Sequence, residues 1–292
     1  MKYKVTYFML AVVILAVGAM VPVDAVSTPD RRLGISPLRN ELTITPGTSF
    51  DGKLTLTNSG QESLAVTMNA EVFSVINEAY DYSFNPSGKE VAWVTFGRKQ
   101  VTVAAGTSET VSYKIAVPLD AEPGGRYLSL FASSQTNVAT TGVTAINRVA
   151  SLLYITVAGN VTRTGTLLSL NSPFLTFEDP TWTATVQNSG TTHFHSIYSV
   201  SVTPVFGGAS VKSAQGDSLI LPSSIRLLSQ SIPRPDILGI YRLDYTVGLG
   251  DVAAYQATKW MLYVPPLQSL LVLAIIIGIF FLFRPKRQKP SK

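Results

Sequence analysis

The chain has 292 residues, no cysteine and a formal net charge of +5. The end segments 1–25 and 265–292 hold seven of its 23 lysines and arginines and one of its 18 acidic residues, so residues 26–264 carry 16 basic and 17 acidic side chains. A body of almost zero net charge without a basic cluster argues against a nucleic-acid binder. The absence of cysteine excludes a disulfide framework, so hydrophobic cores have to hold the body together.

The first 25 residues have the pattern of an export signal. Lys2 and Lys4 give a positive start, an apolar run follows, and Val23 and Ala25 supply the small residues that signal peptidase reads. We therefore predict a signal peptide over residues 1–25. An uncleaved membrane anchor is the alternative.

Short runs of alternating apolar residues fill the segment 26–158. Leu54 and Leu56 fall on one face of a run, and Val101 and Val103 fall on one face of another. Period-two alternation between turns rich in Gly, Pro and Asn is typical of β-strands. About seven such strands predict an antiparallel β-sandwich of immunoglobulin type.

The segment 159–264 repeats this pattern and predicts a second sandwich, so we expect an all-β protein with two tandem immunoglobulin-like β-sandwiches. The tripeptide Asn-Ser-Gly stands early in each half, at 58–60 and 188–190, where it predicts a tight hairpin turn. Tyr127 and Tyr241 each open a late strand after a glycine. At such a place the hydroxyl can bond to the backbone upstream, as a corner tyrosine does.

The first half also carries an insertion rich in aromatic residues, at 74–94, which interrupts the strand pattern. Three of its rings alternate, so one face presents them together to a sugar or a protein. Two basic side chains come shortly after them and could pair with the carboxylates of a wall peptide. The alternative is that the rings cover the open end of the sandwich as core. We predict ligand binding by Tyr80, Tyr82, Phe84, Arg98 and Lys99.

The run 265–283 is apolar and uncharged, and at 1.5 Å per residue it is close to the lower limit for a membrane span. Trp260 and Tyr263 precede it at the depth of an aromatic belt, and the basic segment 284–292 follows it. We predict a transmembrane helix in a single-pass protein of the cell membrane, with extracellular domains and a cytoplasmic tail. A buried core helix is the alternative.

Three stretches, 34–60, 115–132 and 148–161, together with the passage from "KWMLYVPP" into the apolar run, resemble the WxL-interacting protein family of Gram-positive surfaces. The resemblance implies an N-terminal peptidoglycan-binding domain, a second immunoglobulin-like domain that contacts WxL proteins or host ligands, and a C-terminal membrane anchor. It transfers no ligand-contacting residue to this sequence.

Residues with catalytic or metal-binding chemistry are sparse. His193 and His195 share a strand face, but zinc needs three or four ligands and no acidic residue is close in sequence. We interpret them as two exposed histidines. Glu178 and Asp179 are adjacent, so a strand would point them to opposite faces rather than across one substrate. There is no Gly-x-Ser-x-Gly and no phosphate-binding loop, and we expect no enzyme activity, cofactor or metal.

These observations predict a membrane-anchored cell-surface protein with a binding or structural role. Its partners would be cell-wall peptidoglycan, surface proteins or both, with no nucleic acid. The first alternative is a chaperone-like assembly factor that offers an exposed edge strand to a surface protein, as pilus chaperones do. The second alternative, a wall-modifying enzyme, lacks a set of catalytic residues.

Overall fold

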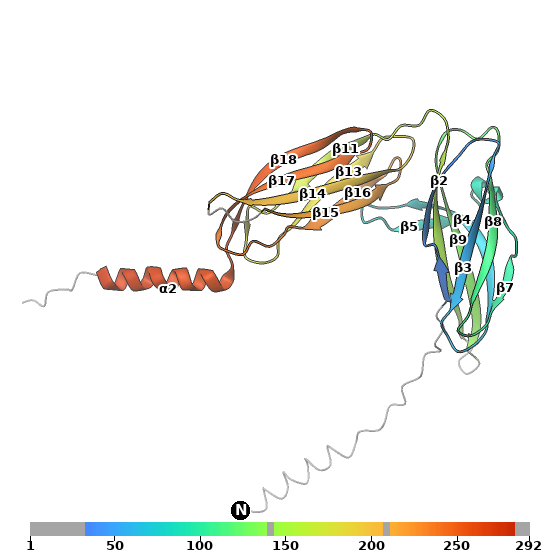
Figure 1. Cartoon of the computed structure of the whole chain (residues 1–292), viewed down its shortest axis with the longest axis horizontal. Coiled ribbons are helices and arrows are strands. Elements are labelled where there is room, and N and C mark those ends of the chain that lie inside the picture. The colour runs from blue at the N-terminus through green and yellow to red at the C-terminus, as the bar shows by residue number, and fades with distance from the viewer. Residues whose placement is uncertain (1–32, 139–142, 207–210, 284–292) are drawn as a thin grey trace, which may run out of the picture.

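The computed structural model describes residues 33–138, 143–206 and 211–283. The predicted signal peptide and the basic tail lie outside these residues. Figure 1 shows two β-sandwiches that follow each other along the chain, with one helix after the second. The all-β prediction is confirmed.

Domain 1 contains two sheets that face each other. The smaller has the order β1-β3-β8-β6, and the larger has the order β2-β10-β9-β4-β5, with β7 also paired to β4. β2 runs parallel to β10, and the other pairs are antiparallel. The elements are β1 (Leu33–Ser36), β2 (Arg39–Ile44), β3 (Ser49–Asn58), β4 (Leu64–Val75), β5 (Tyr82–Asn85), the 3₁₀ helix η1 (Lys89–Trp93), β6 (Val94–Phe96), β7 (Gln100–Val103), β8 (Ser108–Ala116), β9 (Gly124–Val138) and β10 (Val143–Val157).

The core of domain 1 fills the space between these sheets. Leu54 and Leu56 of β3 are fully buried, as their alternation predicts, and they belong to one core with Leu128 and Leu153 of the larger sheet. Burial of each such leucine stabilises the fold by about 1.5–3 kcal/mol. Because neighbours along a strand face opposite ways, Tyr154 next to Leu153 lies on the outer face of the larger sheet.

Domain 2 has the same construction, with a smaller sheet β11-β13-β16 and a larger sheet β12-β18-β17-β14-β15. Its core centres on Trp182, whose ring meets Tyr198 and Tyr245 edge-on. The strands are β11 (Gly165–Asn171), β12 (Leu175–Thr176), β13 (Thr181–Asn188), β14 (Phe194–Pro204), β15 (Lys212–Ile220), β16 (Ile225–Ser231), β17 (Gly239–Leu249) and β18 (Val252–Tyr263).

The Asn-Ser-Gly turns are matching turns, but they are not hairpins. The first joins β3 to β4, which belong to different sheets. The Asn58 side chain is buried, accepts the N–H of Gly60 at 3.0 Å and donates to the carbonyl of Val103 at 3.0 Å. Asn188 repeats both bonds at 2.8 Å, with the end of β15 as acceptor. The turn therefore carries the chain from one sheet to the other, and the buried asparagine fixes it there.

The corner tyrosine occurs in one domain only. The Tyr241 hydroxyl donates to the carbonyl of Ile237 at 2.8 Å, as predicted. The Tyr127 hydroxyl instead lies 3.2 Å from Nδ1 of His193 in domain 2. The equivalent residue of domain 1 thus contributes to the contact between the domains.

The C-terminal helix α2 (Pro266–Phe283) has 18 residues. Among the residues that the structure describes, no helix is long and apolar enough to cross a membrane. The predicted transmembrane helix and the single-pass localisation that followed from it are therefore wrong.

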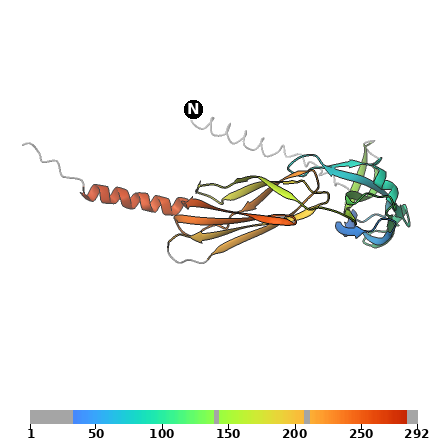
Figure 2. The ribbon, with the colours of Figure 1, turned by 90° about the horizontal axis from the view of Figure 1, so that it is seen from above.

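The molecule bends between its two domains. In Figure 1 the strands of domain 1 run up and down, whereas those of domain 2 run across the page toward α2. Figure 2, turned by 90°, shows α2 continuing from domain 2 away from domain 1. Domain 2 meets the outer face of the larger sheet of domain 1, so this joint brings residues far apart in sequence together.

Candidate functional site

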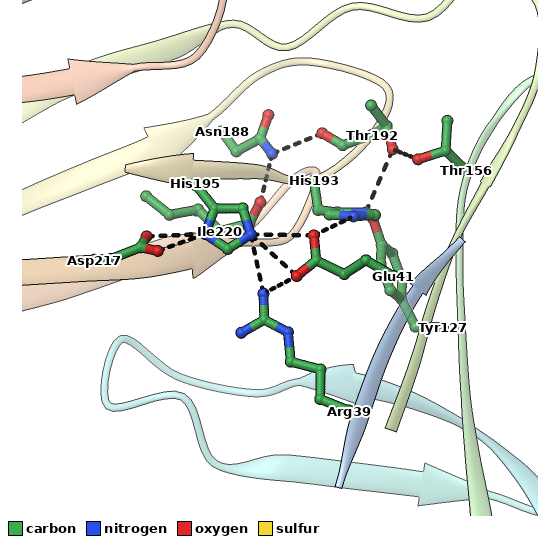
Figure 3. A network of polar contacts seen from close by, with 10 residues as sticks. All are labelled: Arg39, Glu41, Tyr127, Thr156, Asn188, Thr192, His193, His195, Asp217 and Ile220. Atoms are coloured by element: carbon green, nitrogen blue, oxygen red, sulfur yellow. Dashed lines mark hydrogen bonds and ion pairs between the residues drawn. The ribbon is translucent and has the colours of Figure 1, made fainter. Parts of the chain in front are cut away.

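A polar network crosses the joint, and Figure 3 shows His195 of β14 between two carboxylates. Its Nδ1 lies 2.8 Å from Asp217 of β15, and its Nε2 lies 3.1 Å from both carboxylate oxygens of Glu41 on β2. Arg39 pairs with Glu41 and places Nη2 3.1 Å from the same Nε2. A neutral His195 ring can donate to Asp217 and accept from Arg39, and a charged ring can donate to both carboxylates. The ring therefore bridges the domains in either state.

The neighbouring His193 is 7% exposed, so the interpretation of two exposed histidines is wrong for this residue. Its ring stacks edge-on against Tyr127 and Tyr154 of domain 1, at 5.6 and 5.7 Å between centroids. Burial lowers the pKa of His193 to about 4, although the charge of Glu41 opposes this. The residue is buried because domain 1 covers it. No local sequence pattern could have predicted this burial.

The ionic state of Glu41 also depends on the joint. Burial alone would raise the pKa of this carboxyl, but the hydrogen bond with His195 and the charge of Arg39 hold it below its usual value. The network borders a polar cleft of about 350 Å³ between the domains. The described part of the chain contains no group of three or more histidine, cysteine, aspartate or glutamate side chains placed to hold a metal ion.

Backbone and hydroxyl contacts reinforce the network. The hydroxyls of Thr156 and Thr192 are 3.0 Å apart and buried, and the N–H of Gly125 donates to the carbonyl of Thr191 at 2.9 Å. The buried Asn188 donates to the carbonyl of Thr192 at 3.0 Å. The second Asn-Ser-Gly turn therefore also positions the joint.

The structure brings the three rings predicted to bind a ligand into contact, with centroids 6.5 Å apart for Tyr80 and Tyr82 and 6.2 Å apart for Tyr82 and Phe84. Tyr80 is 7% exposed and packs into the joint, whereas Tyr82 and Phe84 on β5 are 39% and 37% exposed. Tyr82 meets Phe73 edge-on, and the Phe84 centroid is 5.0 Å from that of Phe131. The two partly exposed rings thus lie on the outer face of the larger sheet, at the border of the joint.

Arg98 and Lys99 lie in the turn between β6 and β7 and have other partners. Arg98 donates to Glu109 at 3.1 Å and to the carbonyl of Thr110 at 2.8 Å, both on β8 of the smaller sheet. The carbonyl of Lys99 accepts the N–H of Met68 at 2.8 Å. These contacts tie the two residues to their own turn, and ligand binding by them and by the three rings stays a prediction.

Part of β10 is an open strand edge, on the opposite side of the larger sheet from β5. β2 pairs with β10 only over Leu152–Val157, and among the described residues no second strand pairs with the other edge of Val143–Ser151. The N–H of Leu152 donates to Leu38 on the β2 side at 2.8 Å. Because backbone groups alternate along a strand, those of Ile146 and Ala150 point to the open edge. The sequence shows the alternation of β10. It does not show that β2 pairs with only part of β10.

Side chains of the open segment border a shallow trough on the outer face of the larger sheet. Ile146 is 62% exposed, and the Arg148 guanidinium lies 3.2 Å from the Phe131 ring centroid and pairs with Glu71. The trough has a volume of about 500 Å³, and the residues that line it are Ala65, Thr67, Asn69, Ser133, Ile146 and Arg148.

No family model matches the chain. No curated protein matches it either. Solved structures that match include the class 5 fimbriae chaperone CfaA, with 10% identity, a TM-score of 0.40 and coverage of 80% of this chain and 100% of that chain. Another is a CsuC–CsuE chaperone–tip adhesion subunit complex of Acinetobacter baumannii, with 11% identity, a TM-score of 0.37 and coverage of 80% and 99%. At these values the likeness concerns the fold and carries no argument about function.

The predicted membership of the WxL-interacting family is wrong. No family model supports it, and the matching solved structures include fimbriae chaperones. The stretches that carried the resemblance consist largely of Gly, Pro and Asn at turns, which any sandwich of this type needs. The peptidoglycan-binding role that the resemblance implied has no support.

Proposed function

We propose that this chain is a non-catalytic, chaperone-like assembly factor that holds an extended segment of a surface protein along the open edge of β10. The observation that carries the proposal is the edge of β10 at Ile146, Arg148 and Ala150, beside which no second strand pairs among the described residues, whereas Leu152–Val157 pairs with both β9 and β2. An exposed strand edge presents unpaired N–H and C=O groups, and a partner strand can satisfy them.

The surroundings of the edge suit a protein segment. A strand added beside β10 would bring alternate side chains over the outer face, next to the exposed Ile146 and the trough that Arg148 borders. Main-chain hydrogen bonds would then supply affinity, and the side chains in the trough would supply selectivity. The matching solved structures include fimbriae chaperones, but this likeness of fold carries no argument for the function.

A photo-activated cross-linker at position 146, introduced in living cells, tests the proposal. Position 119, where Leu119 is 82% exposed in the loop after β8, is the control. We expect an adduct with a surface protein at 146 and not at 119, and a synthetic peptide of the cross-linked segment should bind the purified chain. Equal adducts at both positions would contradict the proposal.

The peptide then allows a sharper comparison at one residue. Ile146→Pro removes an N–H that points to the open edge, whereas Ile146→Thr keeps it and remains β-branched. Loss of one main-chain bond and the distortion around proline should weaken binding about tenfold, or about 1.4 kcal/mol. Threonine should weaken it much less, and equal affinities of the two variants would exclude strand addition at this edge.

A further inference from the structure

The hairpin between β4 and β5 reaches from domain 1 onto domain 2. In Figure 1 β5 projects from domain 1 toward the second sandwich. The carbonyl of Glu78, in the loop of this hairpin, accepts the N–H of Leu227 on β16 at 3.0 Å. Because β16 is an edge strand of the smaller sheet of domain 2, the hairpin takes up a backbone group at that edge.

Tyr80, at the end of the same loop, is held by three residues of domain 2. Its hydroxyl accepts the N–H of Leu221 at 2.6 Å and lies 3.0 Å from Oγ of Ser224. The guanidinium carbon of Arg226 is 4.0 Å from the centroid of its ring. A buried phenol with a backbone donor and a stacked cation is fixed in both position and orientation.

The ring of Tyr80 also completes an apolar cluster that neither domain forms alone. Phe73 and Tyr154 of domain 1 join it, and Leu219 and Leu221 come from domain 2. All five side chains are less than 9% exposed. The hairpin thus extends the joint beyond the His195 network, which it meets at Tyr154, where the Arg39 guanidinium carbon lies 4.9 Å from the ring centroid.

Two residues with left-handed backbone conformations lie at this contact. Among the described residues, the two non-glycine residues with positive φ are Tyr80, at 70°, and Ser223, at 58°. They stand on opposite sides of the same contact, since Tyr80 touches Ser224. Each belongs to a turn closed within its own domain, by the Tyr80 N–H to the carbonyl of Asn77 at 3.1 Å and by the Ser224 N–H to the carbonyl of Leu221 at 3.3 Å, so two formed turns meet at this contact.

We propose that the β4–β5 hairpin is an interdomain clasp and that Tyr80 is its positioning residue. The clasp locks domain 2 against the outer face of the larger sheet of domain 1. Resting on the proposed function, it thereby sets the angle at which a captured segment meets both domains.

Distance measurements between spin labels test the clasp without any partner. The chain has no cysteine, so Leu119→Cys in domain 1 and Leu168→Cys on β11 give two unique labelling sites on exposed residues. Tyr80→Phe removes the hydroxyl that accepts the Leu221 N–H. Tyr82→Phe is the matched control, because its hydroxyl has a 3.4 Å contact to Tyr154 within domain 1.

We expect one narrow distance distribution for the parent and for Tyr82→Phe, and a clearly broader one for Tyr80→Phe with unchanged far-ultraviolet circular dichroism. Equal widths for the two phenylalanine variants would overturn the clasp. Arg226→Gln, which removes the stacked cation and leaves the hydroxyl, should broaden the distribution less than Tyr80→Phe. A larger effect of Arg226→Gln would remove Tyr80 as the positioning residue.

Peptide binding separates the clasp from the proposed function. Tyr80→Phe should weaken the cross-linked peptide about tenfold, by lowering the fraction of molecules with the domains docked. A broader distribution with unchanged affinity would overturn the role of the clasp in capture. If Ile146→Pro leaves affinity unchanged, the proposed function fails, and the distance distributions alone still decide whether the clasp exists.

Discussion

The two domains end in the same way. The last strand of each, β10 or β18, pairs along its length with the strand before it and runs parallel to a short strand at one end. In domain 1 the parallel partner covers Leu152–Val157, and in domain 2 it covers only Leu262–Tyr263. Both domains therefore leave a long edge of their last strand without a second partner among the described residues.

The side chains on the core side of these two edges differ. Lys259 of β18 stands opposite the buried Leu243 and points inward, where Nζ donates to the carbonyl of Leu170 at 2.7 Å. An inward-pointing lysine on an edge strand is a known protection against pairing with another chain. β10 has Val149 packed against the core of domain 1. The comparison suggests that the same construction yields a protected edge in one domain and an edge available for pairing in the other.

The largest effect on stability should come from the feature that the domains share. Asn58→Ala and Asn188→Ala each leave a glycine N–H and buried carbonyls without their partner, which costs about 2–4 kcal/mol. We expect similar losses in the free energy of unfolding, measured by urea denaturation. Asn188→Ser, which keeps a short polar side chain, is the control. A cost confined to one domain would contradict the equivalence of the turns.

The pH dependence of the free energy of unfolding should distinguish the contribution of the joint from that of the two hydrophobic cores. His193 has a folded pKa of about 4 against about 6.5 unfolded. Between these values the unfolded chain binds a proton that the folded chain does not, so stability is complete above about pH 6.5 and falls as the pH drops toward 4. The loss reaches at most about 3 kcal/mol. Glu41, with its lowered pKa, acts in the same direction at lower pH.

Urea denaturation at intervals between pH 4 and 7.5, followed by tryptophan fluorescence, measures this dependence. His193→Gln has no titrating group at the position and should flatten the curve across the window. An unchanged slope in that variant would assign the pH dependence to other groups.

The two tyrosines at corner positions should respond differently to the same substitution. Tyr241→Phe removes a bond within domain 2 and should lower its stability by about 1 kcal/mol. Tyr127→Phe removes a contact to His193, so it should loosen the joint more than it destabilises domain 1. Hydrogen exchange can localise each effect, and protection lost in the strands of domain 1 alone would speak against this assignment.

The smallest change in stability, within about 1 kcal/mol, is expected for Lys259→Val, because the lysine stem already packs along the edge. Its consequence should be association: without the inward charge, β18 becomes an edge available for pairing. Sedimentation velocity of the variant should show concentration-dependent dimers, while Lys259→Arg stays like the parent. Two monomeric variants would mean that Lys259 does not protect the edge.

The sequence by itself determined which residues are buried within each domain. Alternation at Leu54 and Leu56 identified strands, and the repeated Asn-Ser-Gly identified a shared turn, because periodicity and turn chemistry are local properties. The same locality explains the errors. A turn between two strands has the same residues whether it closes a hairpin or crosses to a second sheet, and an apolar helix gives no direct measure of whether it spans a membrane.

The tertiary structure decided what lies against each exposed face. Only the docking of domain 2 on domain 1 buries His193, places His195 between Glu41 and Asp217, and covers Tyr80, one ring of the predicted ligand site. The short reach of β2 likewise leaves the edge of β10 open. A side-chain pattern reports that a face is suited to burial, whereas contacts between residues more than a hundred positions apart determine what covers it.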